Sequence, residues 1–386
     1  MITNDYLEHY KQHNISPVRQ DISDFNKHFT VRTKLYQDLG LAKTYFKGKK
    51  ILEVGPGSGY NSLITSQLGP SQYVLIEPNE AAISHMKSLF NKYSLQMENI
   101  QIHNLFLEEY MSNTCFDIII CENMLPWIKN NLKVLEKIDN NIEKDGILVI
   151  GCSDEIASFF DISRRLLANI LLQRTSPSTY SEKIDILVNA FSSHLDTLKG
   201  FGRLKEDWCA DNLLGQAVYN VNLSVSDLIQ YFQSDYSYYS MVPNIICDET
   251  WHKEVPLDTY SQNQVKISKF QNTWHNLIHY KEMSEEKSAE ENNLLRELCR
   301  EYFNLIQESE LNYQKSDQHN LIKLLTKILE SLHVKDTNNL IYKSISELIT
   351  FIEDDDISIQ SIATKFQYFH SAFGRGVQYV SMIKVL

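Results

Sequence analysis

The sequence has few glycines and prolines, and its cysteines are not paired along the chain. Among 386 residues there are 13 glycines and 8 prolines, a composition that favours a helix-rich globular protein with few tight turns. None of the 6 cysteines forms a C-x-x-C pair, which argues against a zinc knuckle and a thioredoxin-like redox motif, and no metal site is expected. No run of 18 apolar residues is present, so no membrane-spanning helix is expected.

The sequence also has fewer basic than acidic residues. Lysine and arginine total 37 against 49 aspartates and glutamates, which gives a formal net charge of -12. Nucleic acids and anionic lipids attract basic surfaces, so neither a nucleic acid nor a membrane is an expected partner. The first residues lack a basic start followed by an apolar stretch, so no signal peptide is expected. We expect a reduced, cytoplasmic protein with a small-molecule substrate; its oligomeric state stays open, with a homodimer as one alternative.

Strand-like apolar runs alternate with helix-like segments between residues 50 and 152. The strand-like runs occupy residues 50–54, 72–77, 99–104, 116–121 and 146–152. Segments with helical spacing lie between several of them, at residues 60–68, 79–93 and 128–142. Strands and helices in this rhythm form βαβ units, in which helices cover both faces of a parallel sheet. The sequence therefore predicts an α/β fold with a parallel sheet for this region.

The rest of the chain is mainly helical. Helical periodicity is present at residues 155–173, 181–199, 263–280, 285–309, 318–333 and 338–352. Two further segments are strand-like, one near residues 236–247 and one at the end of the chain. We therefore expect four parts: an N-terminal helical cap at 1–48, a core at 49–155, a helical substrate or lid region at 156–375 and a last strand at 376–386.

A glycine-rich turn follows the first predicted strand. In the stretch KILEVGPGSGYNS, Gly55, Gly57 and Gly59 alternate with other residues. A triphosphate-binding P-loop requires a lysine directly after its last glycine, and none follows here. A dinucleotide-binding loop requires G-x-G-x-x-G, and its third glycine position falls on Tyr60, whose side chain would crowd the approach of the helix to the strand. The spacing therefore argues against both phosphate-bearing ligands.

Two acidic residues flank this turn in the predicted sheet. Glu53 lies two residues before the first glycine, where its carboxylate would repel a pyrophosphate at the helix N-terminus but would suit an ammonium group. Glu77 lies 18 residues after Gly59 at the end of the second strand, where a carboxylate accepts hydrogen bonds from a ribose diol. The glycines and the two acids together favour S-adenosylmethionine (SAM), a nucleoside with a sulfonium cation and an amino-acid tail.

This pattern, together with the later runs FDIII and KDGILVI, resembles the class I SAM-dependent methyltransferases over about residues 45–155. The resemblance implies a Rossmann-like sheet, SAM as cofactor and methyltransferase activity. It also implies that Glu53 and the glycine loop contact the methionine and sulfonium, that Glu77 holds the ribose and that Pro78 packs near the adenine. The implied cofactor-binding residues are Arg32, Glu53, Gly55, Gly57, Gly59, Tyr60, Glu77, Pro78, Asn104, Leu105, Glu122 and Asn123.

For some of these residues the sequence permits more than one role. Asn104 stands where many family members have an acidic residue for the adenine amino group, and its amide oxygen would accept the same hydrogen bond. Arg32 would pair with the methionine carboxylate, or it is an exposed structural arginine. Glu122 and Asn123 follow the fourth strand, where family members place residues near the methyl group and the substrate. Trp127 is either a packing residue or a wall of the substrate pocket.

The segment 200–220 is the strongest substrate candidate outside the core. Asp207 and Asp211 lie four residues apart and would share one helix face, a costly arrangement that Arg203, Lys205 or a cationic or polyol substrate would compensate. The expected substrate-binding residues are Trp127, Trp208, Asn212, Tyr236 and Tyr239.

The whole chain is also similar to a group of bacterial methyltransferase-like proteins with a long helical region after the core. The similarity rests on the stretches GPGSGYNS, EDWCADNLL, YSYYS and FGRGVQYVS. It implies that the strand-like segments at 236–247 and 376–385 return to the sheet as a sixth strand and an antiparallel last strand.

The expected reaction is methyl transfer from SAM to a nitrogen or oxygen nucleophile of a small molecule. Positioning is the main requirement for such a transfer, and a base is needed only where the nucleophile carries a proton. Two alternatives stay open: transfer or cyclisation of the aminocarboxypropyl group of SAM, and a catalytically silent SAM-binding subunit. The candidate bases are Glu122, Asp207, Asp211 and one tyrosine among Tyr236, Tyr238 and Tyr239.

Overall fold

The chain forms two compact units. The structure is a computed structural model that describes residues 5–16, 18–95, 97–215, 223–246, 250–310, 313–334 and 336–386. The first unit contains Met1–Ser153, Asn220–Phe270 and Val377–Leu386, and the second contains Asp154–Tyr219 and Gln271–Gly376. Besides the predicted core, the first unit therefore includes part of the predicted helical region and the end of the chain.

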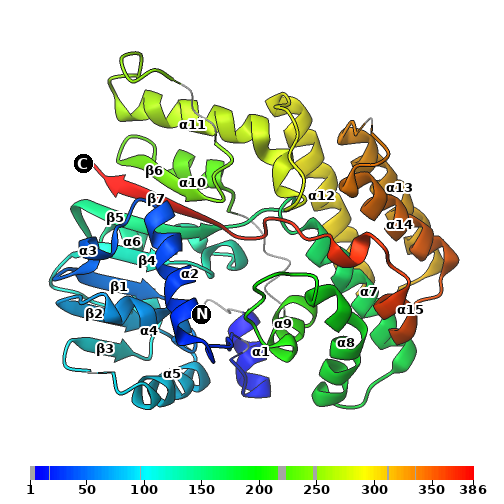
Figure 1. Cartoon of the computed structure of the whole chain (residues 1–386), viewed down its shortest axis with the longest axis horizontal. Helices are drawn as coiled ribbons and strands as arrows, with labels where there is room; N and C mark the ends of the chain where they lie inside the picture. Colours follow the sequence, from blue (N-terminus) through cyan, green and yellow to red (C-terminus); the bar gives the residue numbers. More distant parts are fainter. Residues whose placement is uncertain are drawn as a thin grey trace. The chain divides into compact units, whose positions relative to one another are not determined.

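A seven-stranded sheet in the order β3-β2-β1-β4-β5-β7-β6 forms the centre of the first unit (Figure 1). Its strands are β1 (Lys50–Val54), β2 (Gln72–Ile76), β3 (Ile100–His103), β4 (Phe116–Cys121), β5 (Ile142–Cys152), β6 (Tyr236–Val242) and β7 (Gln378–Lys384). The strands β1 to β5 are parallel, and β7 lies antiparallel between β5 and β6. The predicted Rossmann-like sheet with an antiparallel C-terminal strand is thus confirmed. The strand-like segment 236–247 contains β6, and its last residue, Cys247, lies outside the described residues.

Helices cover the two faces of this sheet. The helices of the first unit are α1 (Asp5–His13), α2 (Phe25–Asp38), α3 (Lys43–Phe46), α4 (Tyr60–Gln67), α5 (Glu80–Lys92), α6 (Asn131–Asp139), α10 (Val225–Phe232) and α11 (Thr259–Thr273). On one face, Ile51, Leu75 and Ile120 of the strands pack with Tyr36 of α2 and Phe90 of α5 in one buried cluster. The crossover from β4 to β5 runs across the sheet in the opposite direction from the crossover from β1 to β2. Because both are right-handed, the helix α6 between β4 and β5 belongs to the other face.

The parallel strands place three loops at one edge of the sheet. The carboxyl ends of β1, β2 and β4 lie side by side, since Glu53 is in register with Leu75 of β2 and with Ile120 of β4. The glycine turn follows β1, Glu77 follows β2 and Glu122 follows β4. In open α/β sheets this edge is where ligands bind.

The outer edge of β6 is capped by a side chain of α11. The carboxamide oxygen of Asn263 accepts a hydrogen bond from the Tyr238 N–H at 3.0 Å, and its nitrogen donates to the Tyr236 carbonyl at 2.7 Å. Unpaired backbone groups on an edge strand invite pairing with other chains. Asn263 satisfies two of these groups within the chain.

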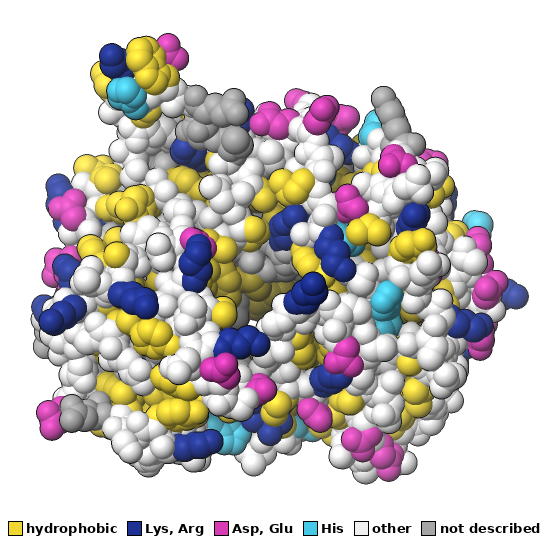
Figure 2. All heavy atoms as spheres, in the orientation of Figure 1, with side chains coloured by type: hydrophobic (Ala, Val, Ile, Leu, Met, Phe, Trp, Pro, Cys, Tyr) yellow, Lys and Arg dark blue, Asp and Glu magenta, His cyan; other side chains and the backbone are white. Residues whose placement is uncertain are grey.

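An exposed apolar segment lies between β6 and α11. Trp251, Val255 and Leu257 have exposed side chains, and Leu257 is fully exposed. This part of the chain is the projecting tip at the upper left of Figure 2, before the start of α11 in Figure 1. Contiguous exposed apolar side chains are typical of surfaces that contact a partner, whereas single ones are ordinary.

The second unit is helical. Its helices are α7 (Phe159–Thr175), α8 (Tyr180–Leu195), α9 (Lys205–Trp208), α12 (Ala289–Ser309), α13 (Lys315–Ser331), α14 (Leu340–Asp354) and α15 (Ile359–Thr364). Arg164 of α7 is fully buried, donates to the carbonyls of Phe160 and Phe369, and lies 3.7 Å from the ring centroid of Phe373. Within the described part of the chain, no helix combines the length and the hydropathy that a bilayer span requires.

Deleting residues 376–386 should abolish cooperative folding. The deletion removes β7, whose loss leaves β5 and β6 without their shared partner and exposes two strand edges. Solubility and thermal unfolding by circular dichroism are the measurements. Deletion of the exposed Leu386 alone is the matched control and should melt like the full chain. A soluble, cooperatively melting protein without residues 376–386 would contradict the role of β7.

Candidate active site at the carboxyl edge of the sheet

The turn after β1 requires glycine at three positions. Gly55, Gly57 and Gly59 have φ angles of +70°, +57° and +77°, in the left-handed region that side chains rarely adopt. A Cβ atom on Gly57 would lie 2.9 Å from a methyl group of Val18, and one on Gly59 would lie 2.5 Å from Cγ of Met86. Gly59 is also the residue that precedes the first turn of α4. The turn is therefore both conformationally and sterically restricted to glycine.

Glu77 joins this turn to the end of β2. One carboxylate oxygen accepts a hydrogen bond from the Gly57 N–H and the other from the Asn79 N–H, each at 2.9 Å. Burial raises the pKa of Glu77 to about 7, and the two backbone hydrogen bonds act in the opposite direction. A carboxylate has about four acceptor positions, so two remain for hydroxyl groups of a ligand. This arrangement suits a ribose diol.

Glu53 lies on the face of the sheet that α2 and α4 cover. Its side chain is buried and accepts a hydrogen bond from the hydroxyl group of Tyr73. Burial raises the pKa of Glu53 to about 7; the nearby charge of Glu122 acts in the same direction, and Arg32 opposes it. A ligand cation beside Glu53 would stabilise its ionised form.

Arg32 of α2 is buried and not exposed, which excludes one of the two alternatives for this residue. Its guanidinium forms an ion pair with Glu122 and donates to the Tyr36 hydroxyl at 3.0 Å, and it lies 4.6 Å from the centroid of the Tyr36 ring. Its Nε atom is buried and has no hydrogen-bond partner among the described residues. The expected contact with a ligand carboxylate stays a prediction, and this Nε–H is the donor that it would use.

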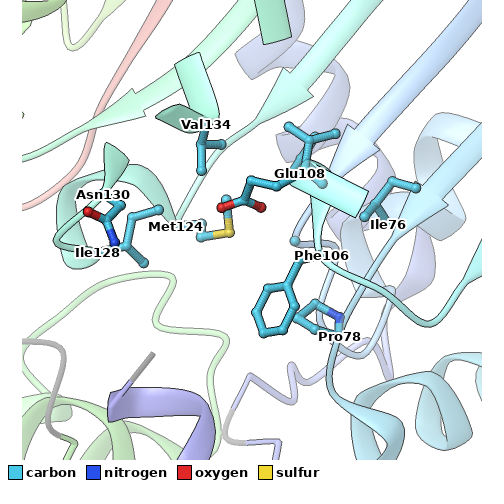
Figure 3. A pocket seen from close by; sticks show the side chains of 11 residues that line it. Ile76, Pro78, Phe106, Glu108, Met124, Ile128, Asn130 and Val134 are labelled. Carbon is cyan, nitrogen blue, oxygen red and sulfur yellow. The ribbon is translucent and has the colours of Figure 1, made fainter. Parts of the chain in front are cut away.

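A mostly apolar pocket opens beside Glu77. In Figure 3 the ring of Phe106 lies beside Pro78, and the carboxylate of Glu108 reaches toward Met124. The space inside it, counted up to open solvent, is about 380 Å³. An apolar lining with few polar groups suits a flat base. The pocket is lined by Val54, Gly55, Ile76, Pro78, Phe106, Leu107, Glu108, Met124, Ile128, Asn130 and Val134.

The residues of the loop after β3 that line the pocket lie further along the chain than the sequence predicts. Asn104 is exposed and donates to the backbone carbonyl of Glu77 at 3.2 Å, and Leu105 is half-buried. Phe106 and Leu107, one and two residues further along, line the pocket instead. The only sequence signal for them is an apolar pair directly after the third strand.

Three predicted residues lie near the loops without lining this pocket. Tyr60 begins α4 and packs at the side of the buried cluster, while its carbonyl group is 3.1 Å from Nε2 of His28. Asn123 is exposed after β4. Trp127 is half-buried in a short 3₁₀ helix, and its N–H donates to the Met124 carbonyl at 3.0 Å. Their predicted roles as cofactor or substrate contacts stay predictions.

The structure does not bring Tyr236 and Tyr239 to the glycine loop. Tyr236 is buried at the start of β6, pairs with Lys384, and donates its hydroxyl hydrogen bond to Asp139 at 2.8 Å. Because β6 runs in the same direction as β5, its start lies at the opposite edge of the sheet from the glycine turn. The ring of Tyr239 covers Gly40, near the end of α2. These positions argue against a substrate or catalytic role for either tyrosine.

The remaining candidates belong to the second unit. Asp207 and Trp208 are buried in α9, and Asn212 donates to the carbonyl of Trp208 at 3.1 Å. Asp211 lies in a π-helical turn and forms an ion pair with Arg203 at 2.6 Å. Arg203 therefore supplies the compensation for Asp211 that the sequence left open. The roles of these residues in substrate binding or proton transfer stay predictions.

Comparisons with known proteins identify one domain. A family model described as a methyltransferase domain matches residues 46–186. No curated protein matches the chain. Partial similarities connect it to solved structures, among them a putative methyltransferase from Thermoplasma acidophilum, with 20% identity over 28% of this chain and 45% of that chain, and a TM-score of 0.25.

Two further solved structures are similar to part of the chain. One is the N-methyltransferase NodS from Bradyrhizobium japonicum WM9 in complex with S-adenosyl-L-homocysteine, with 14% identity over 39% of this chain and 74% of that chain, and a TM-score of 0.31. The other is a SAM-dependent methyltransferase from Clostridium acetobutylicum, with 14% identity over 34% of this chain and 52% of that chain, and a TM-score of 0.28. The chain spans about half the length of the Thermoplasma and Clostridium proteins.

The domain match covers β1 to β5, which form the parallel part of the sheet, and it includes the glycine turn and Glu77. The residues at that edge also fit the cofactor, because the acids lie where a cationic amino-acid nucleoside, and not a pyrophosphate, would bind. The chain therefore carries a methyltransferase domain with a Rossmann-like fold over residues 46–186.

Proposed function

We propose that this protein transfers the methyl group of SAM to a nitrogen or oxygen atom of a small molecule. The observation that carries the proposal is the position of Glu77, which lies between the glycine turn and the apolar pocket with both oxygens fixed by backbone N–H groups. SAM supplies a methyl group on a sulfonium, an excellent leaving group. The tasks of the protein are to orient the two reactants and to exclude water.

In this proposal three parts of the edge hold three parts of the cofactor. Glu77 accepts hydrogen bonds from the ribose hydroxyls. Pro78, Phe106 and Met124 enclose the adenine, and Glu108 accepts a hydrogen bond from its amino group. The amino-acid tail lies toward the glycine turn, where Glu53 attracts the ammonium group.

The charges around the tail support this assignment. When Glu53 is ionised, Glu53 and Glu122 carry two negative charges against the single positive charge of Arg32, and all three side chains are buried. This excess of negative charge favours the ammonium and sulfonium of the ligand. The unpartnered Nε–H of Arg32 favours its carboxylate, because an arginine fork pairs well with a carboxylate.

The acceptor is expected near the end of β4. Glu122 is the candidate base there for a hydroxyl or a protonated amine, since it follows β4 at the ligand-binding edge. The predicted roles of Asp207 and Asp211, which belong to the second unit, stay separate predictions. Metal assistance is not part of the proposal.

Incubation with SAM and fractionated small metabolites should release S-adenosylhomocysteine. That product results when the methyl group alone is transferred, and mass spectrometry of the acceptor should then show a gain of one methyl group. Methylthioadenosine as the product would instead identify transfer or cyclisation of the aminocarboxypropyl group. Stable isolation with another chain, together with no turnover, would favour the silent subunit.

The substitution Glu77→Gln should weaken SAM binding by roughly 10- to 150-fold, because a hydrogen bond to a charged group contributes about 1.5–3 kcal/mol. Isothermal titration calorimetry measures the affinity, and thermal unfolding checks that the variant is folded. The matched control is Glu80→Gln, an exposed glutamate three residues along the chain, which should bind normally. Unchanged affinity in Glu77→Gln would contradict the ribose contact.

Binding of SAM should release about one proton at pH 6.5. The pKa values of Glu53 and Glu77 are raised to about 7, above the ordinary 4.5, so both carboxyl groups are largely protonated there. A ligand cation and two ribose hydroxyls favour the ionised forms, which lowers both pKa values and expels protons. The amino group of SAM is already protonated at this pH and contributes little.

Titrations in two buffers with different ionisation enthalpies measure this proton count. The release should fall as the pH rises from 6.5 toward 8, because both carboxylates are then increasingly ionised before binding, and Glu53→Gln should lower it at pH 6.5. Equal binding enthalpies in the two buffers at pH 6.5 would show that neither carboxyl group ionises on binding.

A further inference from the structure

A short N-terminal segment crosses the glycine turn. We call Ile15, Ser16 and Val18 the strap. The Ser16 hydroxyl is 2.8 Å from the hydroxyl of Ser58 in the turn, and both side chains are buried. The Ile15 carbonyl accepts a hydrogen bond from the side chain of Asn79 at 3.1 Å.

The third contact of the strap is steric. A Cβ atom on Gly57 would lie 2.9 Å from a methyl group of Val18, so the side chain of Val18 rests directly on the turn. Because this contact involves the turn itself, the strap touches the residues on both sides of the Glu77 carboxylate: Gly57 and Ser58 on one side, Asn79 on the other.

The carboxylate under the strap is nearly inaccessible. Glu77 is 6% exposed, and its two oxygens are bound to the N–H groups of Gly57 and Asn79, the residues that the strap contacts. A ribose that binds this carboxylate has to come between residues that the strap contacts. The strap therefore covers the edge that the cofactor has to reach.

We infer that the strap is a gate that opens to admit the nucleoside and closes over it. This inference rests on the proposed function, because it concerns how the same site is entered. Among the described residues, the gate is held by two hydrogen bonds between neutral groups and one apolar contact. Such a latch allows an open state populated at about 0.1–10%, which is sufficient for binding to proceed through it.

The gate makes a kinetic prediction that a permanent structural contact does not make. Weakening the latch in Ser16→Ala or Val18→Ala raises the population of the open state, so association and dissociation of S-adenosylhomocysteine should both accelerate by about 5- to 10-fold. The dissociation constant should change by less than about 3-fold. Stopped-flow fluorescence measures both rates. Ser71→Ala removes a serine hydrogen bond to the Gly48 carbonyl away from the turn and is the matched control.

A disulfide that holds the gate closed provides a second test of the inference. The double variant Ser16→Cys/Ser58→Cys places two thiols where the hydroxyl oxygens are 2.8 Å apart, within reach of a disulfide with its S–S bond of about 2.05 Å. Mass spectrometry verifies that the bond has formed. The oxidised protein should bind S-adenosylhomocysteine at least 100-fold more slowly than the reduced protein, and dithiothreitol should restore the rate.

The outcomes distinguish a failure of the gate from a failure of the proposed function. Equal association rates in the oxidised and reduced double variant, or unchanged rates in both single variants, would overturn the gate while leaving SAM as the cofactor. Failure of both SAM and S-adenosylhomocysteine to bind the unmodified protein would overturn the proposed function and the gate together.

Discussion

The arrangement of the ligand-binding edge depends on the buried carboxylate of Glu77, which connects two loops. Its oxygens accept N–H groups from the turn after β1 and from the start of α5, so it holds two loops that belong to different strands. A carboxylate buried this deeply loses its hydration, which is why its pKa rises to about 7 even with two backbone donors. Further hydrogen-bond donors would reduce the remaining energetic cost of that burial, and a ribose diol would supply two.

Glu77 also lies between an apolar part and a charged part of this edge. On one side the pocket offers Pro78, Phe106 and Met124 to a flat base. On the other side the turn leads to Glu53 and to the pair of Arg32 and Glu122. A pyrophosphate in the second part would meet a net negative charge in a poorly hydrated environment, where Coulomb repulsion is strong. In the proposed site, the turn would therefore discriminate by charge when Glu53 is ionised, as well as by the spacing of its glycines.

The parts of the site that follow a local rule could be predicted from the sequence. Alternating strands and helices predict a parallel sheet, and the carboxyl ends of such strands bring Glu53, Glu77 and Glu122 to one edge. Phe106 and Leu107 could not be predicted in the same way. Their place in the pocket depends on the path of the loop after β3, which leads into a short 3₁₀ helix at Leu107–Glu109, and a loop path has no periodicity to read.

The direction of β6 is the other feature that the sequence does not predict. An isolated strand-like segment such as 236–247 shows no sign of which end will lie near the ligand. Because β7 is antiparallel to both of its neighbours, β6 runs parallel to β5 and starts at the far edge, and this places Tyr236 beside Asp139. Only the pairing of strands distant in sequence decides this.

The ion pair between Arg32 and Glu122 constrains how the tail of a ligand can bind. Removing one partner of a buried ion pair typically costs about 3–5 kcal/mol, because the other charge is left uncompensated. Arg32 therefore cannot leave Glu122 for a ligand carboxylate unless the cation of the ligand compensates Glu122. The Nε–H of Arg32 offers a route that avoids this exchange, since it is a donor that the pair with Glu122 does not use. On this argument the ligand carboxylate adds to the pair instead of replacing Glu122, and the negative charge of Glu122 stays in place beside the incoming sulfonium.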